Sequence, residues 1–276
     1  MKLVKNPSVN KTKLAKELGI SRSSLYYKPK REQIDLEIKS QIESVMIDNP
    51  SYGHKRIAIA LKLNKKRIRR VMKKYGLKPY RSRYKPPKPE DENKPETIYP
   101  NLIKTICPIR PNIIWASDFT YIKYKGRFIY LATIIDIYTR EIIGWNISRF
   151  HNKYLVLGAL KDALEKTNSL PIYLHSDQGS EYDSEDYTKY AESLGIQISM
   201  SKKSSPWENG FQESYYSNFK VDLKDPESFD TLGELIEAIN QTIFYYNTER
   251  IHGKLKMSPK SFRNFRMKVI ESCVLV

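Results

Sequence analysis

The chain has 276 residues, of which 40% are hydrophobic, enough for one large domain with a core and one or two small domains. Its two cysteines, Cys107 and Cys273, form neither a disulfide framework nor a zinc site by themselves, so we expect a cytoplasmic rather than a secreted protein. The N-terminus has no apolar signal-peptide core and no stretch approaches the roughly 20 apolar residues of a membrane span, so we expect no membrane partner.

The positive charge is concentrated at one end of the chain. Residues 1–90 carry 25 of the 48 Lys and Arg residues but only 7 of the 31 acidic residues, whereas residues 91–276 have a balance of −1. The net charge of +17 therefore belongs to the N-terminal third, where its field attracts polyanions. This asymmetry predicts a nucleic-acid-binding region joined to a part with another task, and a merely solubilising surface is the alternative.

Residues 1–31 have the pattern of a helix-turn-helix. In KTKLAKELGISRSSLYYKP the apolar residues form one helical face, and Gly19 permits a sharp turn. Ser21 can cap a short second helix that Pro29 ends. We expect that second helix to expose Arg22 to DNA.

Residues 32–77 predict a second, helix-turn-helix-like region. Its last segment, LNKKRIRRVMKKYGLK, has apolar residues at the helical period, with Asn64 as a suitable N-cap and Gly76 as a suitable residue after the last turn. Nearly every other position is basic, which suits the DNA major groove, although a solvated or membrane-surface helix has the same pattern. The residues expected to contact DNA from it are Lys65, Lys66, Arg67, Arg69, Arg70 and Lys73.

Residues 78–111 predict a linker, because they contain eight of the fifteen prolines. Such a run cannot form a helix and should be extended. It would separate two regions while letting the basic region reach along DNA.

Residues 112–225 predict an α/β domain, and residues 226–276 predict a helical extension of it. Three strand-like runs, IIWASDFTYIKY, RFIYLATIIDIY and REIIGWNI, have only short segments between them and should form an antiparallel meander. Two further strands, PIYLHSD and IQISM, alternate with helical patterns. The order β-β-β-α-β-α-β-α predicts a ribonuclease-H-like architecture, with a mixed five-stranded sheet and flanking helices, preceded by an all-α helix-turn-helix region.

Three carboxylates occupy positions that such a sheet would bring together. Asp118 lies in the middle of the first strand among apolar neighbours, where a charge is costly unless something binds it. Asp177 ends the fourth strand, which neighbours the first in this order, and Gly179 lets the backbone turn closely there. Glu213 lies on the next helix after the fifth strand, which can lay its side chain across both aspartates.

Hard oxygen ligands in this arrangement suit Mg²⁺, with Mn²⁺ as a possible substitute, rather than zinc. Two such ions, about 3.5–4 Å apart, can activate the attacking oxygen and stabilise the leaving oxygen during phosphoryl transfer. The basic region would deliver the substrate, a phosphodiester. Because the chain has 31 acidic residues, position alone is weak evidence for this triad.

Several segments resemble the catalytic core of insertion-sequence transposases: WASDFTYI, YLATIIDIYTREIIGW, LHSDQGSEY, SMSKKSSPWENGFQESYYSNFK and FYYNTERIHGKLKMSP. These enzymes belong to the retroviral-integrase (DDE) superfamily, in the class whose transposase is encoded by two overlapping frames. The 35 residues between Asp177 and Glu213 match the spacing of that superfamily, and Lys220 lies where the family carries a basic residue. SYGHKRIAIAL and NKKRIRRVMKKYGLK are similar to its helix-turn-helix segment, so the resemblance covers roughly residues 12–262.

The resemblance implies that Asp118, Asp177 and Glu213 are the catalytic residues and metal ligands of a DNA-cutting and strand-joining enzyme. Water would first attack a phosphodiester at an element end, and the freed 3′-hydroxyl would then attack a second phosphodiester. In this class the reaction makes a circular intermediate that inserts into target DNA. One departure is the pair Glu208-Asn209, where the family usually has Asp-Asn before the catalytic helix.

The implied partners are double-stranded DNA, as terminal inverted repeats and as target, and further copies of the chain assembled on that DNA. Because the chain lacks the leucine-zipper segment of the upstream frame, we expect the downstream-frame product, acting with the upstream-frame protein. We expect it in the cytoplasm, associated with the nucleoid. Two alternatives stay open: a catalytically inactive DNA-binding regulator of the element, and a nuclease that hydrolyses but does not join.

The remaining candidate residues have weaker signals. Lys202 and Asn209, which precede the last catalytic helix, and Arg250 in YNTER are candidates for DNA contact, although YNTER is interpreted as a packing motif rather than a catalytic one. Asp136 is interpreted as a hairpin residue rather than a metal ligand. His175, two positions before Asp177, either lies near the metals or is packed and hydrogen-bonded.

Overall fold

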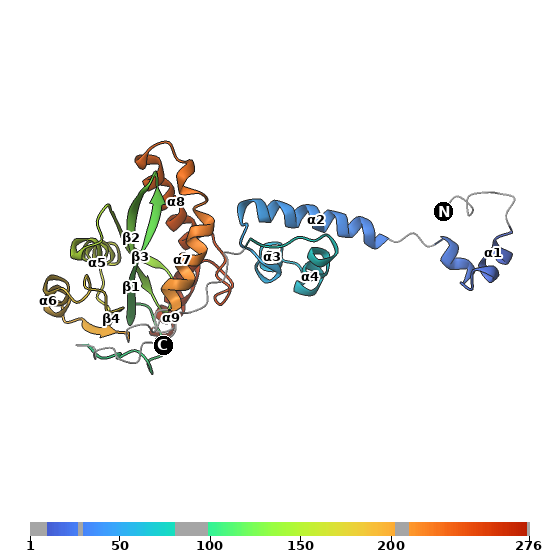
Figure 1. Ribbon diagram of the computed structural model, residues 1–276. Helices are drawn as coiled ribbons and strands as arrows, with labels where there is room; N and C mark the ends of the chain where they lie inside the picture. The colour runs from blue at the N-terminus through green and yellow to red at the C-terminus, as the bar shows by residue number, and fades with distance from the viewer. Residues whose placement is uncertain (1–9, 27–29, 81–98, 202–209, 275–276) are drawn as a thin grey trace, which may run out of the picture.

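The computed structural model of the protein describes residues 10–26, 30–80, 99–201 and 210–274. Figure 1 shows a sheet with helices on both faces and a group of helices from the N-terminal part of the chain beside it. The predicted fold class, an α/β domain preceded by helices, is therefore confirmed. Within the described ranges, no helix has both the length and the apolar character that crossing a membrane requires.

The strands form one mixed sheet of five in the order β3-β2-β1-β4-β5. Its antiparallel part consists of β1 (Ile114–Tyr124), β2 (Arg127–Asp136) and β3 (Ile142–Ser148). The parallel part continues from β1 to β4 (Tyr173–Ser176) and β5 (Gln197–Met200). The predicted meander and the predicted neighbour relation of the first and fourth strands are both confirmed.

Two helical layers cover the sheet (Figure 1). One layer consists of α5 (Lys153–Thr167) and α6 (Glu185–Ser193), and the other of α7 (Gly210–Asp222) and α8 (Leu232–Thr248). Side chains alternate between these layers along β1: Trp115 packs with α5 and α6, whereas Ile114 and Ala116 pack with α7 and α8. A short 3-10 helix, η4 (Pro226–Ser228), and α9 (Pro259–Val274) complete the domain.

The N-terminal helices follow the sequence prediction closely. After α1 (Lys11–Glu17), Gly19 has a φ of +63°, and Ser21 Oγ accepts a hydrogen bond from Ser24 N at 3.2 Å. The expected second helix is the 3-10 helix η2 (Arg22–Tyr26); Pro29 lies outside the described residues.

The second helical region contains α2 (Lys30–Asp48), α3 (His54–Ala60) and α4 (Lys65–Lys74). These helices share a core that includes Ile42, Ile57 and Ile68. As predicted, Asn64 caps α4, its side chain accepting a hydrogen bond from Lys66 N at 2.8 Å, and Gly76 adopts a left-handed φ of +69°.

The second helical region docks directly on the end of the α/β domain. Tyr52 Oη accepts a hydrogen bond from Ile251 N at 2.6 Å, and Ser51 Oγ accepts one from Arg250 Nη2 at 2.8 Å. Tyr245, near the end of α8, donates to Asn49. The contacts join segments about 200 positions apart in sequence, which no local sequence pattern reveals.

The proline-rich segment does not remain apart from the core throughout. Residues 81–98 lie outside the described residues, but Ile103 and Ile106 pack against the core of the α/β domain. Leu102 N also donates to Ser199 Oγ on β5 at 2.9 Å. The segment after residue 98, which the proline content assigned to the linker, therefore packs against the α/β domain.

Candidate active site

The sheet brings the two aspartates to neighbouring positions. Asp118 lies in β1 opposite Thr133 of β2, and Asp177 directly follows β4, the parallel neighbour of β1. Because side chains alternate along a strand, Asp118 lies on the same face as Ala116, towards α7. Its Oδ1 accepts a hydrogen bond from Phe119 N at 2.8 Å, and Asp177 Oδ1 accepts one from Gly179 N at 3.1 Å.

Buried polar contacts fix the rotation of α7, which carries Glu213. Gln212 Nε2 donates to the carbonyl oxygens of Ala116 at 2.7 Å and Thr133 at 3.1 Å. Tyr216 Oη donates to the carbonyl oxygen of Asp118 at 2.7 Å. The start of α7 is thus anchored to the strand that carries Asp118. Glu213, the residue after Gln212, is therefore held near Asp118, and its side chain is exposed.

The charges of Asp177 and Glu213 both act on the carboxyl group of Asp118. Burial, together with the charges of Asp177 and Glu213, raises the pKa of Asp118 to about 8, although the hydrogen bond from the Phe119 N–H lowers it. Burial also raises the pKa of Asp177, with a contribution from Glu181, and that of Glu213. Like charges gathered in a partly buried place are stabilised by a cation, which is the property that a metal site requires.

The donor chemistry fits Mg²⁺ or Mn²⁺, because all three side chains offer hard oxygen atoms. Within the described part of the chain, however, no three His, Cys, Asp or Glu side chains lie close enough together to hold a metal ion.

Comparison with known proteins assigns the family. Residues 108–206 and 194–259 match models described as integrase core domain. The transposase of insertion sequence element IS904 from Lactococcus lactis is 35% identical over 252 residues, which cover 87% of this chain and 99% of that protein. The chain belongs to the insertion-sequence transposases. These are DNA-cutting and strand-transferring enzymes with a ribonuclease-H-like core, as the resemblance of the sequence implied.

Further matches agree with this assignment. A putative transposase for IS150 from Escherichia coli is 30% identical, over 91% of this chain and 92% of that protein. A simian T-cell lymphotropic virus intasome structure has the same fold, with a TM-score of 0.51, 14% identity and coverage of 77% of this chain and 70% of that one. Residues 10–31 match a helix-turn-helix model described as bacterial regulatory protein, Fis family, which supports the first predicted DNA-binding unit of the transposase.

One acidic residue near the site was missed by sequence reasoning. Glu181, four positions after Asp177, is nearly buried and its Oε1 lies 2.8 Å from His151 Nδ1. Burial raises the pKa of Glu181, but the hydrogen bond and charge of His151, together with hydrogen bonds from its own backbone and from Ser180, lower it overall. The His151 ring stacks on Phe119, the residue after Asp118, with 6.2 Å between ring centroids. The only sequence signal for Glu181 is its place in DQGSEY.

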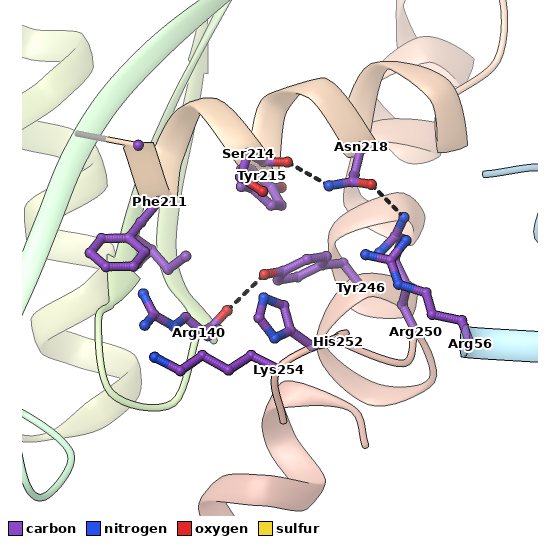
Figure 2. Close-up of a pocket in the computed structure, with 12 residues that line it drawn as sticks. Arg56, Arg140, Phe211, Ser214, Tyr215, Asn218, Tyr246, Arg250, His252 and Lys254 are labelled. Atoms are coloured by element: carbon purple, nitrogen blue, oxygen red, sulfur yellow. Dashed lines mark hydrogen bonds between the residues drawn. The ribbon is translucent and has the colours of Figure 1, made fainter. Parts of the chain in front are cut away.

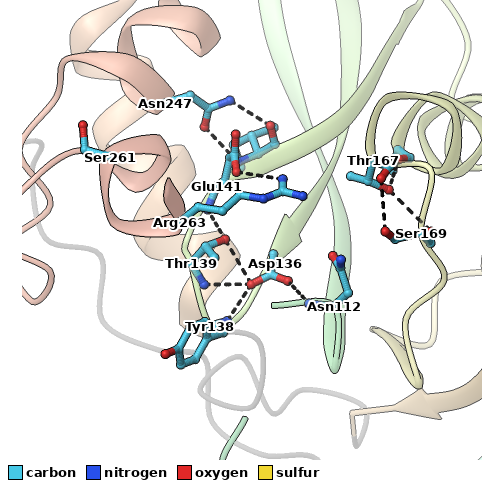
Figure 3. Close-up of polar contacts among 12 residues, drawn as sticks. Asn112, Asp136, Tyr138, Thr139, Glu141, Thr167, Ser169, Asn247, Ser261 and Arg263 are labelled. Carbon is cyan, nitrogen blue, oxygen red and sulfur yellow. Dashed lines mark hydrogen bonds and ion pairs between the residues drawn. The ribbon is translucent and has the colours of Figure 1, made fainter. Parts of the chain in front are cut away.

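Asp136 and His175 have structural roles, as shown for Asp136 in Figure 3. Asp136 is 1% exposed and accepts hydrogen bonds from the backbone N–H groups of Asn112, Tyr138 and Thr139, at 2.7–2.9 Å. It therefore organises the β2–β3 turn, as the sequence interpretation held. His175 is fully buried on β4, and its Nδ1 lies 3.0 Å from Ser199 Oγ.

The basic residues predicted on α4 lie on its exposed side, opposite Ile68, Val71 and Met72. One of them has a partner within the protein: Arg70 forms a bidentate ion pair with the buried carboxylate of Asp35, with its Nη1 at 2.7 Å from Oδ2. Arg22 is exposed on η2. Lys202 and Asn209 lie outside the described residues.

Lys220 and Arg250 differ in their exposure. Lys220 is exposed on α7 nearly two turns after Glu213, with its Nζ 4.9 Å from the Tyr121 ring centroid. Arg250 is only 1% exposed and pairs with Asp222 at 2.5 Å. Its guanidinium is buried at the joint between the helical region and α7, so the predicted DNA contact of Arg250 stays a prediction, whereas its packing role is visible in the structure.

Proposed function

We propose that this transposase cuts and joins DNA strands at the ends of an insertion sequence, using Mg²⁺ bound by Asp118, Asp177 and Glu213. The observation that supports this most directly is that Asp177 and Glu213 both raise the pKa of Asp118. Two acids from separate segments thus act on the carboxyl group of a third, in a fold shared with DNA strand-transferring enzymes. Mn²⁺ would substitute for Mg²⁺, and two ions would be bound in the active assembly.

When bound, the metal would supply activation of the attacking oxygen and stabilisation of the leaving oxygen. The protein's own groups would orient the DNA for this chemistry. Gln212 and Tyr216 would hold α7 against β1 through the bonds described above, so that Glu213 meets Asp118. Lys220, on the same face of α7 as Glu213, would hold a phosphate near the cut.

Recognition of the element ends would come from the two helical regions. The exposed basic residues of α4 would contact DNA phosphates and bases in the major groove, and Arg22 would contribute from the first unit. Terminal repeats and target DNA would be held by several copies of the chain, with the upstream-frame protein as a further partner.

A strand-transfer assay tests the proposal with DNA carrying the terminal sequences that flank the coding region. Joined products should form with Mg²⁺ or Mn²⁺ and not with a chelator, and Glu213→Gln should abolish them. Glu165→Gln, on the exposed side of α5, is the matched control and should retain activity. Nicked but never joined products would indicate a nuclease, and metal-independent binding without any cutting would indicate a regulator.

A further inference from the structure

A second group of like charges lies beside α7, on a different side of the helix from Glu213. A pocket of about 320 Å³ is enclosed by α7, the β2–β3 turn, the segment after α8, and α3. Figure 2 shows the basic side chains gathered below the helix. All the charged residues that line the pocket are basic, with one histidine among them: Arg56, Arg140, Arg250, Lys254 and His252.

One of the buried cations of the pocket, Arg140, has an unmet hydrogen-bonding atom. Arg140 is 7% exposed, its guanidinium lies 3.8 Å from the Phe211 ring centroid, and its Nη1 is buried with no hydrogen-bond partner. Of the acids next to it in sequence, Asp136 acts on Arg140 through its charge, but its carboxylate bonds to backbone N–H groups, and Glu141 pairs with Arg263 at 3.1 Å. Among the described residues no acid forms an ion pair with Arg140, and burial lowers its pKa overall, so an anion that entered the pocket would be stabilised there.

The rest of the pocket adds to the positive potential. Arg250 is balanced by Asp222, but among the described residues no ion pair involves Arg56 or Lys254. His252 Nδ1 is a second buried atom without a hydrogen-bond partner. Burial and then the four surrounding cations lower the pKa of His252 to about 4, so the ring is neutral at pH 7 and can still donate a hydrogen bond.

We propose that this pocket binds a phosphate group, supplied by the backbone of a DNA strand that passes from the helical region to the carboxylates. Guanidinium groups match phosphate oxygens in geometry and charge, and their hydrogen bonds to phosphate are among the stronger ones. The pocket lies between the helical region and the carboxylates. Arg56 on one side belongs to the helical region, and Gly210 and Phe211 on the other begin the helix that carries Glu213. The identification of the source as DNA rests on the proposed function, whereas the anion chemistry does not.

The test compares Arg140→Met with Lys161→Met, which removes the same charge from an exposed position on α5, across the sheet. Binding of a fluorescein-labelled duplex of mixed sequence is measured in EDTA, so that it does not depend on catalysis. Arg140→Met should bind about tenfold more weakly, with a salt slope shallower by about one. Lys161→Met should bind as the wild type does.

A stability measurement distinguishes binding from a structural role. Removing an unpaired buried cation should leave the DNA-free melting temperature of Arg140→Met unchanged or raise it. Lys254→Met, at the exposed rim, is a second variant that leaves the core intact and should bind about threefold more weakly. Equal loss of affinity in Lys161→Met, or full affinity in both pocket variants, would overturn the DNA assignment.

Inorganic phosphate separates the two sources of the anion. At matched ionic strength, phosphate should raise the melting temperature of the wild type more than chloride does, and Arg140→Met should lose that difference. This result together with unchanged DNA affinity would assign the pocket to a free phosphate group. Neither a phosphate effect nor a DNA effect would show that the pocket is no anion site, even if strand transfer is active.

Discussion

The two sides of α7 carry groups of opposite charge. On one side, Glu213 lies with two aspartates, and burial and mutual repulsion raise the pKa of Asp118 to about 8. On the other, the charged residues that line the pocket around Arg140 are all basic; among the described residues Arg250 alone of these is paired to an acid, Asp222, and the pKa of His252 falls to about 4. One helix therefore separates a group of acids whose charges suit a cation from a group of bases whose charges suit an anion.

This difference indicates what each side is built to receive. A folded protein does not gather like charges away from water without cost, so such groups are stabilised by a ligand of opposite sign. The acidic side fits a divalent metal and the basic side fits a phosphate. These are the two components that a strand-transfer enzyme must hold together. Three sets of substitutions and one pH series test these two assignments and the role of the basic face of α4.

The largest effect is expected on the acidic side. Asp118→Asn and Asp177→Asn each remove a proposed metal ligand while retaining the size of the side chain. Strand transfer, measured as joined product over time, should fall at least about a thousandfold. DNA affinity in EDTA should stay within about twofold, because neither residue holds DNA by itself. Undiminished strand transfer in either variant would remove that residue from the site.

The next effect concerns the one arginine of the basic side that has an acid partner. Arg250→Ala leaves Asp222 buried without its counter-ion and removes the contacts with Ser51 and Asn218. The free energy of unfolding, from urea titration, should fall by about 3–5 kcal/mol. Arg140→Met should cause no comparable loss. If the two variants lose equal stability, the distinction between a paired and an unpaired arginine is wrong.

A smaller effect is expected on the exposed face of α4, where basic side chains are separated by water. Replacing Arg67 and Arg69 by Ala should weaken DNA binding about tenfold and reduce the salt slope by about two. Arg70→Ala is the informative contrast, since its bond with Asp35 predicts a loss of stability as well. An unaltered salt slope in the double variant would show that Arg67 and Arg69 do not touch phosphate.

The smallest effect is the pH dependence of stability in the metal-free protein. The folded-state pKa of Asp118, about 8, exceeds the usual value near 4, so the folded state holds this proton more tightly than the unfolded state. The resulting stability is complete below about pH 4 and is lost as the pH rises through about 8. Between pH 5 and 8 in EDTA, the wild type should lose a few degrees of melting temperature relative to Asp118→Asn. Parallel curves for the two proteins would contradict the raised pKa.

Local patterns predicted much of the molecule. The strand runs and their order gave the sheet, and that order places β1 beside β4 and hence Asp118 near Asp177. The caps of α4 were also predictable, because Asn64 and Gly76 act through their own backbone neighbourhood. These features depend on residues close together in sequence or on general rules of strand connection.

The features that could not be predicted depend on distant segments meeting. Arg250 was expected to contact DNA because it is a basic residue in a family motif. Its burial depends on Asp222 and on Ser51, about 200 positions earlier, which the motif does not reveal. The basic pocket likewise combines Arg56, Arg140 and Lys254 from separate elements. Prolines between residues 99 and 111 indicated an extended chain, but composition alone could not show that Ile103 and Ile106 pack on the core.

Calorimetric titration of Mn²⁺ into the metal-free protein, with Asp118→Asn as the variant and Glu165→Gln as the control, tests the central claim most directly. Saturable binding is expected for the wild type and for Glu165→Gln, and binding weakened at least about tenfold is expected for Asp118→Asn. Equal binding to all three proteins would show that the ion is held elsewhere and that the gathered carboxylates are not the metal site.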